Sequence, residues 1–306
     1  MTNHTAIPGL HHVTAISGNA QDNVDFFTGT LGQRLVKRTV NFDAPDTYHL
    51  YYGDRTGRPG TVMTFFPFAD AAPGRAGPGM ASAVAYAVPA ARFDDLTTDL
   101  AARDVPFTPS VMRFGRQVVT LRAPDGLALE LVESPEATDT HAFHSATLWV
   151  RDPDPTIRLL TEVMGYAVTG TERSGGEERT RLEAPGGSEA RVLDVIRRDG
   201  VAQARSGAGT IHHIAFRART QDEQHGWQER LAAAGHPTTP VIDRQYFNAI
   251  YFREPGGILF EIATDPPGFA VDEPVDRLGS SLMLPAQHEA ARARIERVLP
   301  PLKVPA

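Results

Sequence analysis

The chain has no cysteine among its 306 residues. This absence excludes disulfide bonds, thiolate catalysis and zinc sites built from thiolates. No apolar run approaches the ~18 residues that a membrane-spanning helix needs. The N-terminal segment MTNHTAIPGL has neither the basic start nor the apolar centre of a secretory signal. We therefore expect a cytoplasmic protein without a membrane partner.

The sequence also has no run rich in lysine and arginine, and its formal net charge is −7. Both features argue against a nucleic-acid partner, because nucleic-acid binding needs a concentrated basic surface. Apolar residues make up 41% of the chain and charged residues 22%, a composition typical of globular proteins. At this length we expect about two domains.

One pattern occurs four times along the chain. Each copy starts with a short apolar run, continues with a stretch of helical periodicity, and then has further β-branched or aromatic runs that end at glycine or proline. The copies span about 10–66, 82–133, 143–196 and 211–263. Each copy predicts a βαβββ module, with left-handed helix caps at Gly32, Gly165 and Gly235 in three of them.

The modules predict an α+β protein with two tandem domains and a tail. We place the N-terminal domain, with the first two modules, at 7–135 and the C-terminal domain, with the last two, at 141–270. The tail, 271–306, contains one amphipathic stretch over 286–298 that ends before two prolines. We expect this stretch to form a helix that packs on the outside of the protein.

Two histidine pairs stand out, because each begins a predicted strand. His11 and His12 lie in GLHHVTAIS, and His212 and His213 lie in TIHHIAFRA. Glu261 lies in the apolar run GGILFEIAT. Two histidines and one carboxylate form the facial triad of non-haem Fe(II) oxygenases, which leaves coordination positions open for substrate and O2.

The repeat provides a comparison within the chain. His213 precedes Glu261 by 48 residues, and in the second module Ala83 precedes Glu130 by 47. The third module has Ser145 and Asp194 near these positions, and the first has His12 with Thr64 or Phe65. Only the first and fourth modules together supply two histidines and an acid. A single metal site therefore requires these two modules to be adjacent.

A lone histidine in a strand is more often a hydrogen-bonded residue than a ligand, so the repetition of the pair is what carries the hypothesis. Because successive strand residues face opposite sides, only one histidine of each pair points at the metal unless the strand is irregular there. We interpret Glu130, which has no histidine partner, as part of a structural ion pair. For His49, a cavity position and an ordinary strand position remain equally open.

The ordered segments LHHVTAISGNAQDNVDFFTGTLGQRLVKRTVNFD, TYHLYYGDRTGRPGTVMTFFPF, TIHHIAF and NAIYFREPGGILFEIATDPPGF resemble the vicinal-oxygen-chelate superfamily. This superfamily includes glyoxalases, bleomycin-resistance proteins and extradiol dioxygenases, and the similarity is greatest to its hydroquinone-cleaving branch. The resemblance implies open, cup-like mixed sheets. It also implies an enzyme for aromatic compound degradation.

The resemblance assigns roles to individual residues. His12, His213 and Glu261 match the iron ligands, while His11, His212 and Thr14 match residues of the substrate pocket. Arg244 and Tyr251 match a pair that holds the phenolic oxygen and exchanges its proton, and His11 would also carry protons. An arginine beside a tyrosine favours the phenolate, so we expect Arg244 to lower the pKa of Tyr251.

The sequence thus predicts an Fe(II)-dependent, extradiol-type dioxygenase that acts on hydroquinones or related dihydroxylated aromatics with O2. Mn(II) or another divalent metal also suits this ligand set. One alternative is a glyoxalase-like isomerase or lyase with Zn2+, Ni2+ or Mn2+, although such enzymes would use two acids around the metal. Another is a metal-free binding protein of the bleomycin-resistance type. A homo-oligomer is compatible with the sequence.

Overall fold

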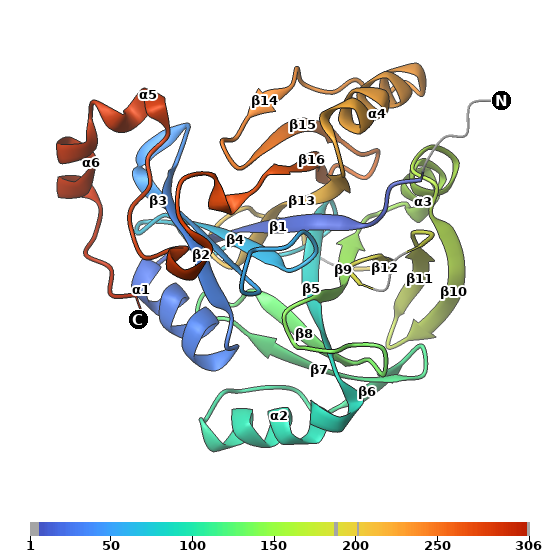
Figure 1. The fold of residues 1–306 in the computed structure, drawn as a ribbon. Helices are drawn as coiled ribbons and strands as arrows, with labels where there is room; N and C mark the ends of the chain where they lie inside the picture. The colour runs from blue at the N-terminus through green and yellow to red at the C-terminus, as the bar shows by residue number, and fades with distance from the viewer. Residues whose placement is uncertain (1–5, 187–188, 201, 305–306) are drawn as a thin grey trace.

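The computed structural model describes residues 6–186, 189–200 and 202–304, and it contains two eight-stranded mixed sheets (Figure 1). The first sheet contains β1 (Leu10–Ser17), β2 (Arg34–Asn41), β3 (Ala44–Gly53), β4 (Val62–Pro67), β13 (Thr210–Ala218), β14 (Ile242–Asp243), β15 (Phe247–Arg253) and β16 (Leu259–Pro267). The second contains β5 (Met80–Val88), β6 (Val111–Arg113), β7 (Arg116–Arg122), β8 (Ala128–Glu133), β9 (Phe143–Trp149), β10 (Ala167–Ser174), β11 (Glu177–Glu183) and β12 (Val192–Arg198). The α+β class and the four modules are therefore confirmed.

Each sheet combines one module from each of the two predicted domains. The first sheet has the order β14-β15-β16-β13-β1-β4-β3-β2, so it joins the fourth module to the first. The second has the order β10-β11-β12-β9-β5-β8-β7-β6 and joins the third module to the second. Both sheets contain strands from both predicted domains. The bounds 7–135 and 141–270 therefore stay a prediction about how the modules follow one another along the chain. The adjacency that a single metal site requires is present.

The two faces of β1 explain how the site is supported. Val13 and Ala15 are fully buried in the apolar core, which contains residues from both sheets. His12 and Thr14, the alternate residues, line a cavity on the opposite face. This division follows from the period of two along a strand. One side of the strand holds the sheet on the core, and the other side is available for polar chemistry.

Helices lie on the outside of the sheets (Figure 1). They are α1 (Ala20–Val24), α2 (Ala90–Ala102), α3 (Pro153–Arg158), α4 (Gln221–Ala233), α5 (Ala286–Glu289) and α6 (Arg292–Val298). α1 and α3 continue into π-helical turns at Asp25–Thr30 and Leu159–Val163. The expected left-handed caps are confirmed, with φ of 64° at Gly32, 81° at Gly165 and 84° at Gly235.

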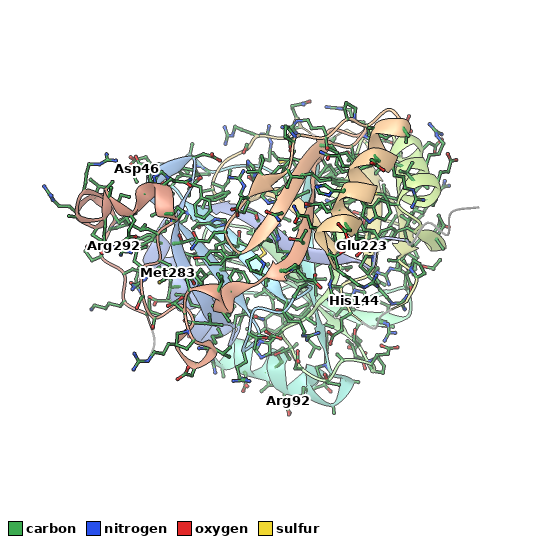
Figure 2. The ribbon with its side chains drawn as sticks, turned by 45° about the horizontal axis from the view of Figure 1, so that its top comes forward. Asp46, Arg92, His144, Glu223, Met283 and Arg292 are labelled. Atoms are coloured by element: carbon green, nitrogen blue, oxygen red, sulfur yellow. The ribbon has the colours of Figure 1, made fainter. Side chains whose placement is uncertain are left out.

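The tail differs from the single predicted helix over 286–298, because α5 and α6 are separate helices with a break between them. Ile295 of α6 is buried, and the Tyr48 hydroxyl on β3 donates to the carbonyl of Pro300 at 2.9 Å. The tail therefore packs beside β3, as expected for its outside position. In Figure 2, Arg292 marks the tail and Glu223 marks α4, which covers the other end of the same sheet. Within the described residues, no helix has the length and apolarity to cross a membrane.

Candidate metal centre

Three neighbouring strands bring the predicted ligands together. In the sheet register, His12 of β1 lies opposite Ala215 of β13, and Ala215 lies opposite Glu261 of β16. Register partners share a face, and His213 shares that face because it precedes Ala215 by two residues. The two imidazoles and the carboxylate therefore surround the small side chain of Ala215. The space above this methyl group is where an ion would lie.

The distances fit one ion. A carboxylate oxygen of Glu261 lies 3.4 Å from His12 Nε2 and 2.9 Å from His213 Nε2, and all three ligand atoms lie within 4.8 Å of one another. Ligands at ~2.1 Å from a metal and at right angles to each other are about 3 Å apart. Two imidazole nitrogens and a carboxylate also form the donor set that Fe(II), Mn(II) and Zn(II) accept.

The polar atoms at this point also lack other partners. Within the described chain, both Glu261 carboxylate oxygens and His213 Nε2 are buried without a hydrogen-bond partner. Burial would raise the pKa of Glu261, but His12 and His213 hold it below its ordinary value. Burial lowers the pKa of His213. A buried carboxylate without a hydrogen-bond donor costs free energy unless a cation joins it. The residues present therefore fit a metal.

The strands have a bulge at each histidine pair, and within each pair the two imidazole rings lie within hydrogen-bond distance of each other. The β1–β13 register shifts between Leu10 and His12, and again between Thr14 and Ala15, opposite the second pair. His11 Nδ1 lies 2.9 Å from His12 Nδ1, and His212 Nδ1 lies 2.7 Å from His213 Nδ1. If each second histidine offers Nε2 to a metal, its Nδ1 carries the proton and donates to its neighbour. Such partners orient ligand rings and fix their tautomers.

The second sheet shows what occupies the same positions without histidine. Glu130 lies opposite Ala85 and Asp194 opposite Thr147, the registers that correspond to Glu261 opposite Ala215. Arg113 donates to Glu130 at 2.7 Å. Arg179 and Arg181 donate to Asp194 at 2.9 and 2.8 Å. Guanidinium groups thus compensate the carboxylates of this sheet, whereas the described residues around Glu261 offer imidazoles instead.

This difference predicts a large stability effect at Asp194. Replacing Asp194 by alanine leaves Arg179 and Arg181 buried without their carboxylate, and breaking such a buried pair costs about 3–5 kcal/mol in free energy of unfolding. Denaturant titration at pH 7 measures the change. The arginines lower the pKa of Asp194 despite its burial, so its contribution is present above the unfolded value of about 3.9 and is lost as the pH falls through the lower folded value.

The matched control is Asp199→Ala, which removes an 82% exposed carboxylate from Arg197. An exposed pair contributes only about 0–1 kcal/mol, so this variant should unfold almost like the wild type. Equal destabilisation by the two replacements would show that the buried arginines do not depend on Asp194. Metal content should stay the same in both variants, because Asp194 belongs to the other sheet and Asp199 directly follows its strand β12.

The candidate ligands open onto a cavity of about 450 Å³. This volume suits a small organic ligand, and apolar side chains cover much of its wall. The phenylalanines of the wall are Phe42, Phe66, Phe68 and Phe247. Thr14 and His212 also line the cavity, as do Arg244 and Tyr251. Seven of the eight predicted site residues thus meet at one cavity.

His11 is the exception among these residues. This residue is 3% exposed, and its ring lies 5.3 Å from that of Phe247. Burial lowers its pKa to about 3, followed by the effect of His12. His11 is not among the residues that line the cavity, and its expected part in the pocket and in proton transfer stays a prediction.

Arg244 and Tyr251 meet as expected, although the electrostatic outcome differs. Arg244 Nε donates to the Tyr251 hydroxyl at 3.2 Å, and the register places Tyr251 opposite Glu261. Burial and the charge of Glu261 raise the pKa of Tyr251, and Arg244 offsets only part of that rise. The expected lowering by Arg244 is therefore confirmed, although burial and Glu261 outweigh it. The phenol keeps its proton at neutral pH.

Sequence reasoning missed several residues of the wall. Tyr51 lies opposite Thr64, as Tyr251 lies opposite Glu261, so alignment of the first and fourth modules could have found it. The turn with Asn41, Phe42 and Asp43 was missed because nothing in its sequence indicates that it covers the cavity. Asp43 accepts from Arg244 at 3.3 Å and links this turn to the far end of the sheet. His49 lines the cavity, which decides the open question about its position.

Comparisons with known proteins agree with this architecture. The Glyoxalase/Bleomycin resistance protein/Dioxygenase superfamily matches residues 9–131 and 142–262. A Bacillus subtilis (strain 168) protein named "Putative ring-cleaving dioxygenase MhqO" is 45% identical over 97% of both chains. The Chlorohydroquinone/hydroquinone 1,2-dioxygenase of Sphingobium indicum is 33% identical over 96% of both chains. A crystal structure described as a "putative dioxygenase" from Bacillus subtilis has a TM-score of 0.93 at 44% identity, covering 98% of this chain and 99% of that one.

Proposed function

The chain belongs to the Glyoxalase/Bleomycin resistance protein/Dioxygenase superfamily, and on this premise we propose that it is an Fe(II)-dependent ring-cleaving dioxygenase of the extradiol type. Its substrates would be hydroquinones or related dihydroxylated aromatics, with O2 as the second substrate. Both atoms of O2 would enter the product while one carbon–carbon bond of the ring breaks. The single observation that carries this proposal is the triad of His12, His213 and Glu261 at the base of an aromatic-lined cavity.

The ligand set supports oxygen chemistry over isomerisation. An enolising isomerase would use a second acid, and the matching position holds Thr64, whose hydroxyl lies 3.0 Å from Thr14 and 2.8 Å from His49. Three protein ligands leave more of the coordination sphere open than four. When bound, Fe(II) supplies the redox centre that a reaction between an aromatic ring and O2 requires. The relatives named as ring-cleaving dioxygenases support the same choice.

The other residues of the site would bind the ring and control protons. Phe66, Phe68 and Phe247 offer faces and edges for contact with an aromatic ring and exclude water from it. Because the Tyr251 oxygen accepts from Arg244, the phenol proton is free to point to a substrate oxygen. His212 would shape the wall beside the ligands, and Thr14 would line it further along β1. His11 would act through His12 by holding that ring in place.

Metal loading followed by an oxygen assay tests this function. Protein loaded with Fe(II) under anaerobic conditions should consume O2 with a hydroquinone and give a ring-opened acid, one O2 for each ring. The same protein loaded with Zn(II) should consume none. A panel of hydroquinones and catechols in an oxygen electrode measures the preference between the two classes. Fe(II)-loaded protein that binds these compounds and takes up no O2 would remove the dioxygenase assignment and favour an isomerase or a binding protein.

A further inference from the structure

A second polar system lies on the cavity wall, on strands at and beyond β1 in the sheet order, whereas Arg244 and Tyr251 lie at the β14–β15 end. It runs through Thr14 on β1, Thr64 on β4, and His49 and Tyr51 on β3. Thr14 Oγ1 lies 3.0 Å from Thr64 Oγ1, and Thr64 Oγ1 lies 2.8 Å from His49 Nε2. The Tyr51 hydroxyl lies 2.8 Å from His49 Nδ1. Four side chains from three adjacent strands thus form one continuous chain of hydrogen bonds.

The placement of this chain gives it access to the substrate at two points. Thr14, His49 and Tyr51 line the cavity, whereas Thr64 lies beneath them and is fully buried. Thr14 pairs in the sheet with His213, so one end of the chain lies beside the candidate metal. The other end, Tyr51, belongs to a cluster that also contains Tyr246 and Phe269 and contacts Tyr251. The chain therefore joins the metal side of the cavity to another part of its wall.

The central histidine is neutral and uses both ring nitrogens. Burial holds the pKa of His49 well below its ordinary value, and His12, His213 and Arg244 lower it further. A neutral imidazole has one donor and one acceptor, so His49 donates to one neighbour and accepts from the other. If Nδ1 carries the proton, it donates to Tyr51, and Thr64 donates to Nε2. If Nε2 carries the proton, it donates to Thr64, and Tyr51 donates to Nδ1.

We propose that Thr14, Thr64, His49 and Tyr51 form a proton relay between the two parts of the cavity wall. In one transfer, Tyr51 gives its proton to an oxygen in the cavity and takes the proton from His49 Nδ1. His49 Nε2 then takes the Thr64 hydroxyl proton, Thr64 takes that of Thr14, and Thr14 takes one from a hydroxyl group in the cavity. Each O–H or N–H bond that breaks is replaced on the same residue, except that the imidazole changes its tautomer. No electrons are transferred and no residue changes its charge.

This relay rests on the proposed function for its chemical use. A dihydroxylated substrate loses a proton when one of its oxygens binds beside the ligands, and an oxygen elsewhere gains a proton as the ring opens. Arg244 and Tyr251 serve one of these places. The relay gives the other a route that needs no bulk water, since its four members are at most partly exposed.

Substitutions of matched shape separate a relay from a hydrogen-bonded support. Thr64→Val removes the hydroxyl at nearly constant volume, and Thr64→Ser restores it. The side-chain amide in His49→Gln keeps a hydrogen-bond donor group and an acceptor group, but it cannot pass a proton from one to the other as the imidazole does. We expect Thr64→Val and His49→Gln to lower kcat by about 10²-fold, the lower end for acid–base catalysis, with little change in KM or metal content. We also expect kcat, measured in H2O–D2O mixtures, to follow a curve when plotted against the deuterium fraction for the wild type and Thr64→Ser. For Thr64→Val and His49→Gln the same plot should be a straight line.

Nuclear magnetic resonance of ¹⁵N-labelled histidine tests the relay without any turnover. Zn(II)-loaded wild type should show His49 as an average of both tautomers, and Thr64→Val should show one. The relay is overturned if wild-type His49 holds a single tautomer that Thr64→Val leaves unchanged, or if Thr64→Val changes only KM. Absence of O2 uptake by the wild type would instead contradict the proposed function, and the relay would then be decided by the tautomers.

Discussion

Replacing His213 by alanine is expected to leave the first sheet folded and to remove the metal from the protein. His213 supplies one of only three candidate ligand atoms, and its imidazole is 2.9 Å from the Glu261 carboxylate. Loss of residues that merely orient a ligand already costs 10–100-fold in metal affinity, so loss of a ligand should cost more than about 100-fold. Metal analysis after dialysis, with circular dichroism for the fold and an oxygen electrode for activity, measures the result.

His144→Ala is the matched control for this replacement. His144 lies on β9 of the second sheet beside Ser145, as His212 lies beside His213, and its Nδ1 is 2.9 Å from the Ser145 hydroxyl. This variant should keep both metal and O2 uptake. If His213→Ala kept one equivalent of Fe(II) after dialysis, the assignment of the centre would be contradicted. If both variants lost metal together, the effect would come from the fold rather than from ligation.

The candidate ligands could be singled out from the sequence because the repeat compares equivalent positions within one chain. A histidine in one strand has many ordinary explanations, but two pairs that begin equivalent strands restrict them. The same comparison predicted that the first and fourth modules are adjacent, because only these two together supply two histidines and a carboxylate. The register now supports that comparison, because Thr64 lies opposite Thr14 as Glu261 lies opposite Ala215.

Features that depend on pairing between distant strands could not be predicted in the same way. The bulges at the two histidine pairs arise where β1 meets β13, two strands about 200 residues apart in the chain. Regular alternation left the direction of the first histidine of each pair open, because the register shifts depend on the partner strand. The raised pKa of Tyr251 likewise depends on burial and on Glu261, which a local sequence does not specify.

The short strands and the divided tail have a similar origin. The runs 105–112 and 238–244 have the composition of strands, but the paired parts are β6 and β14 at the outer ends of the two sheets. An edge strand pairs on one side only, so its length depends on one neighbour rather than on composition. Periodicity predicted the tail helix at 286–298 without the break between α5 and α6, and the contacts of α6 with β3 lie far away in the sequence.

Tyr251→Phe is expected to lower kcat by about 10²–10⁴-fold while metal content stays the same. The replacement removes only the hydroxyl that accepts from Arg244 at 3.2 Å, and leaves the ring 5.8 Å from that of His213. Because the raised pKa keeps the phenol protonated at neutral pH, the lost group is a proton donor rather than a base. Oxygen uptake at saturating substrate gives kcat, and metal analysis gives occupancy.

The control for Tyr251→Phe is Tyr48→Phe, which removes a buried tyrosine hydroxyl that donates to Pro300 at the tail. It should reduce stability by about 1 kcal/mol through the lost hydrogen bond and leave kcat unchanged. A selective loss of kcat in Tyr251→Phe would mean that the phenol proton takes part in turnover. If instead KM rose by about 10²–10⁴-fold while kcat stayed unchanged, Tyr251 would only bind the substrate. That result would contradict the proposed transfer of its proton. Arg244 would then only orient the Tyr251 ring through its hydrogen bond, because the Tyr251 hydroxyl would transfer no proton.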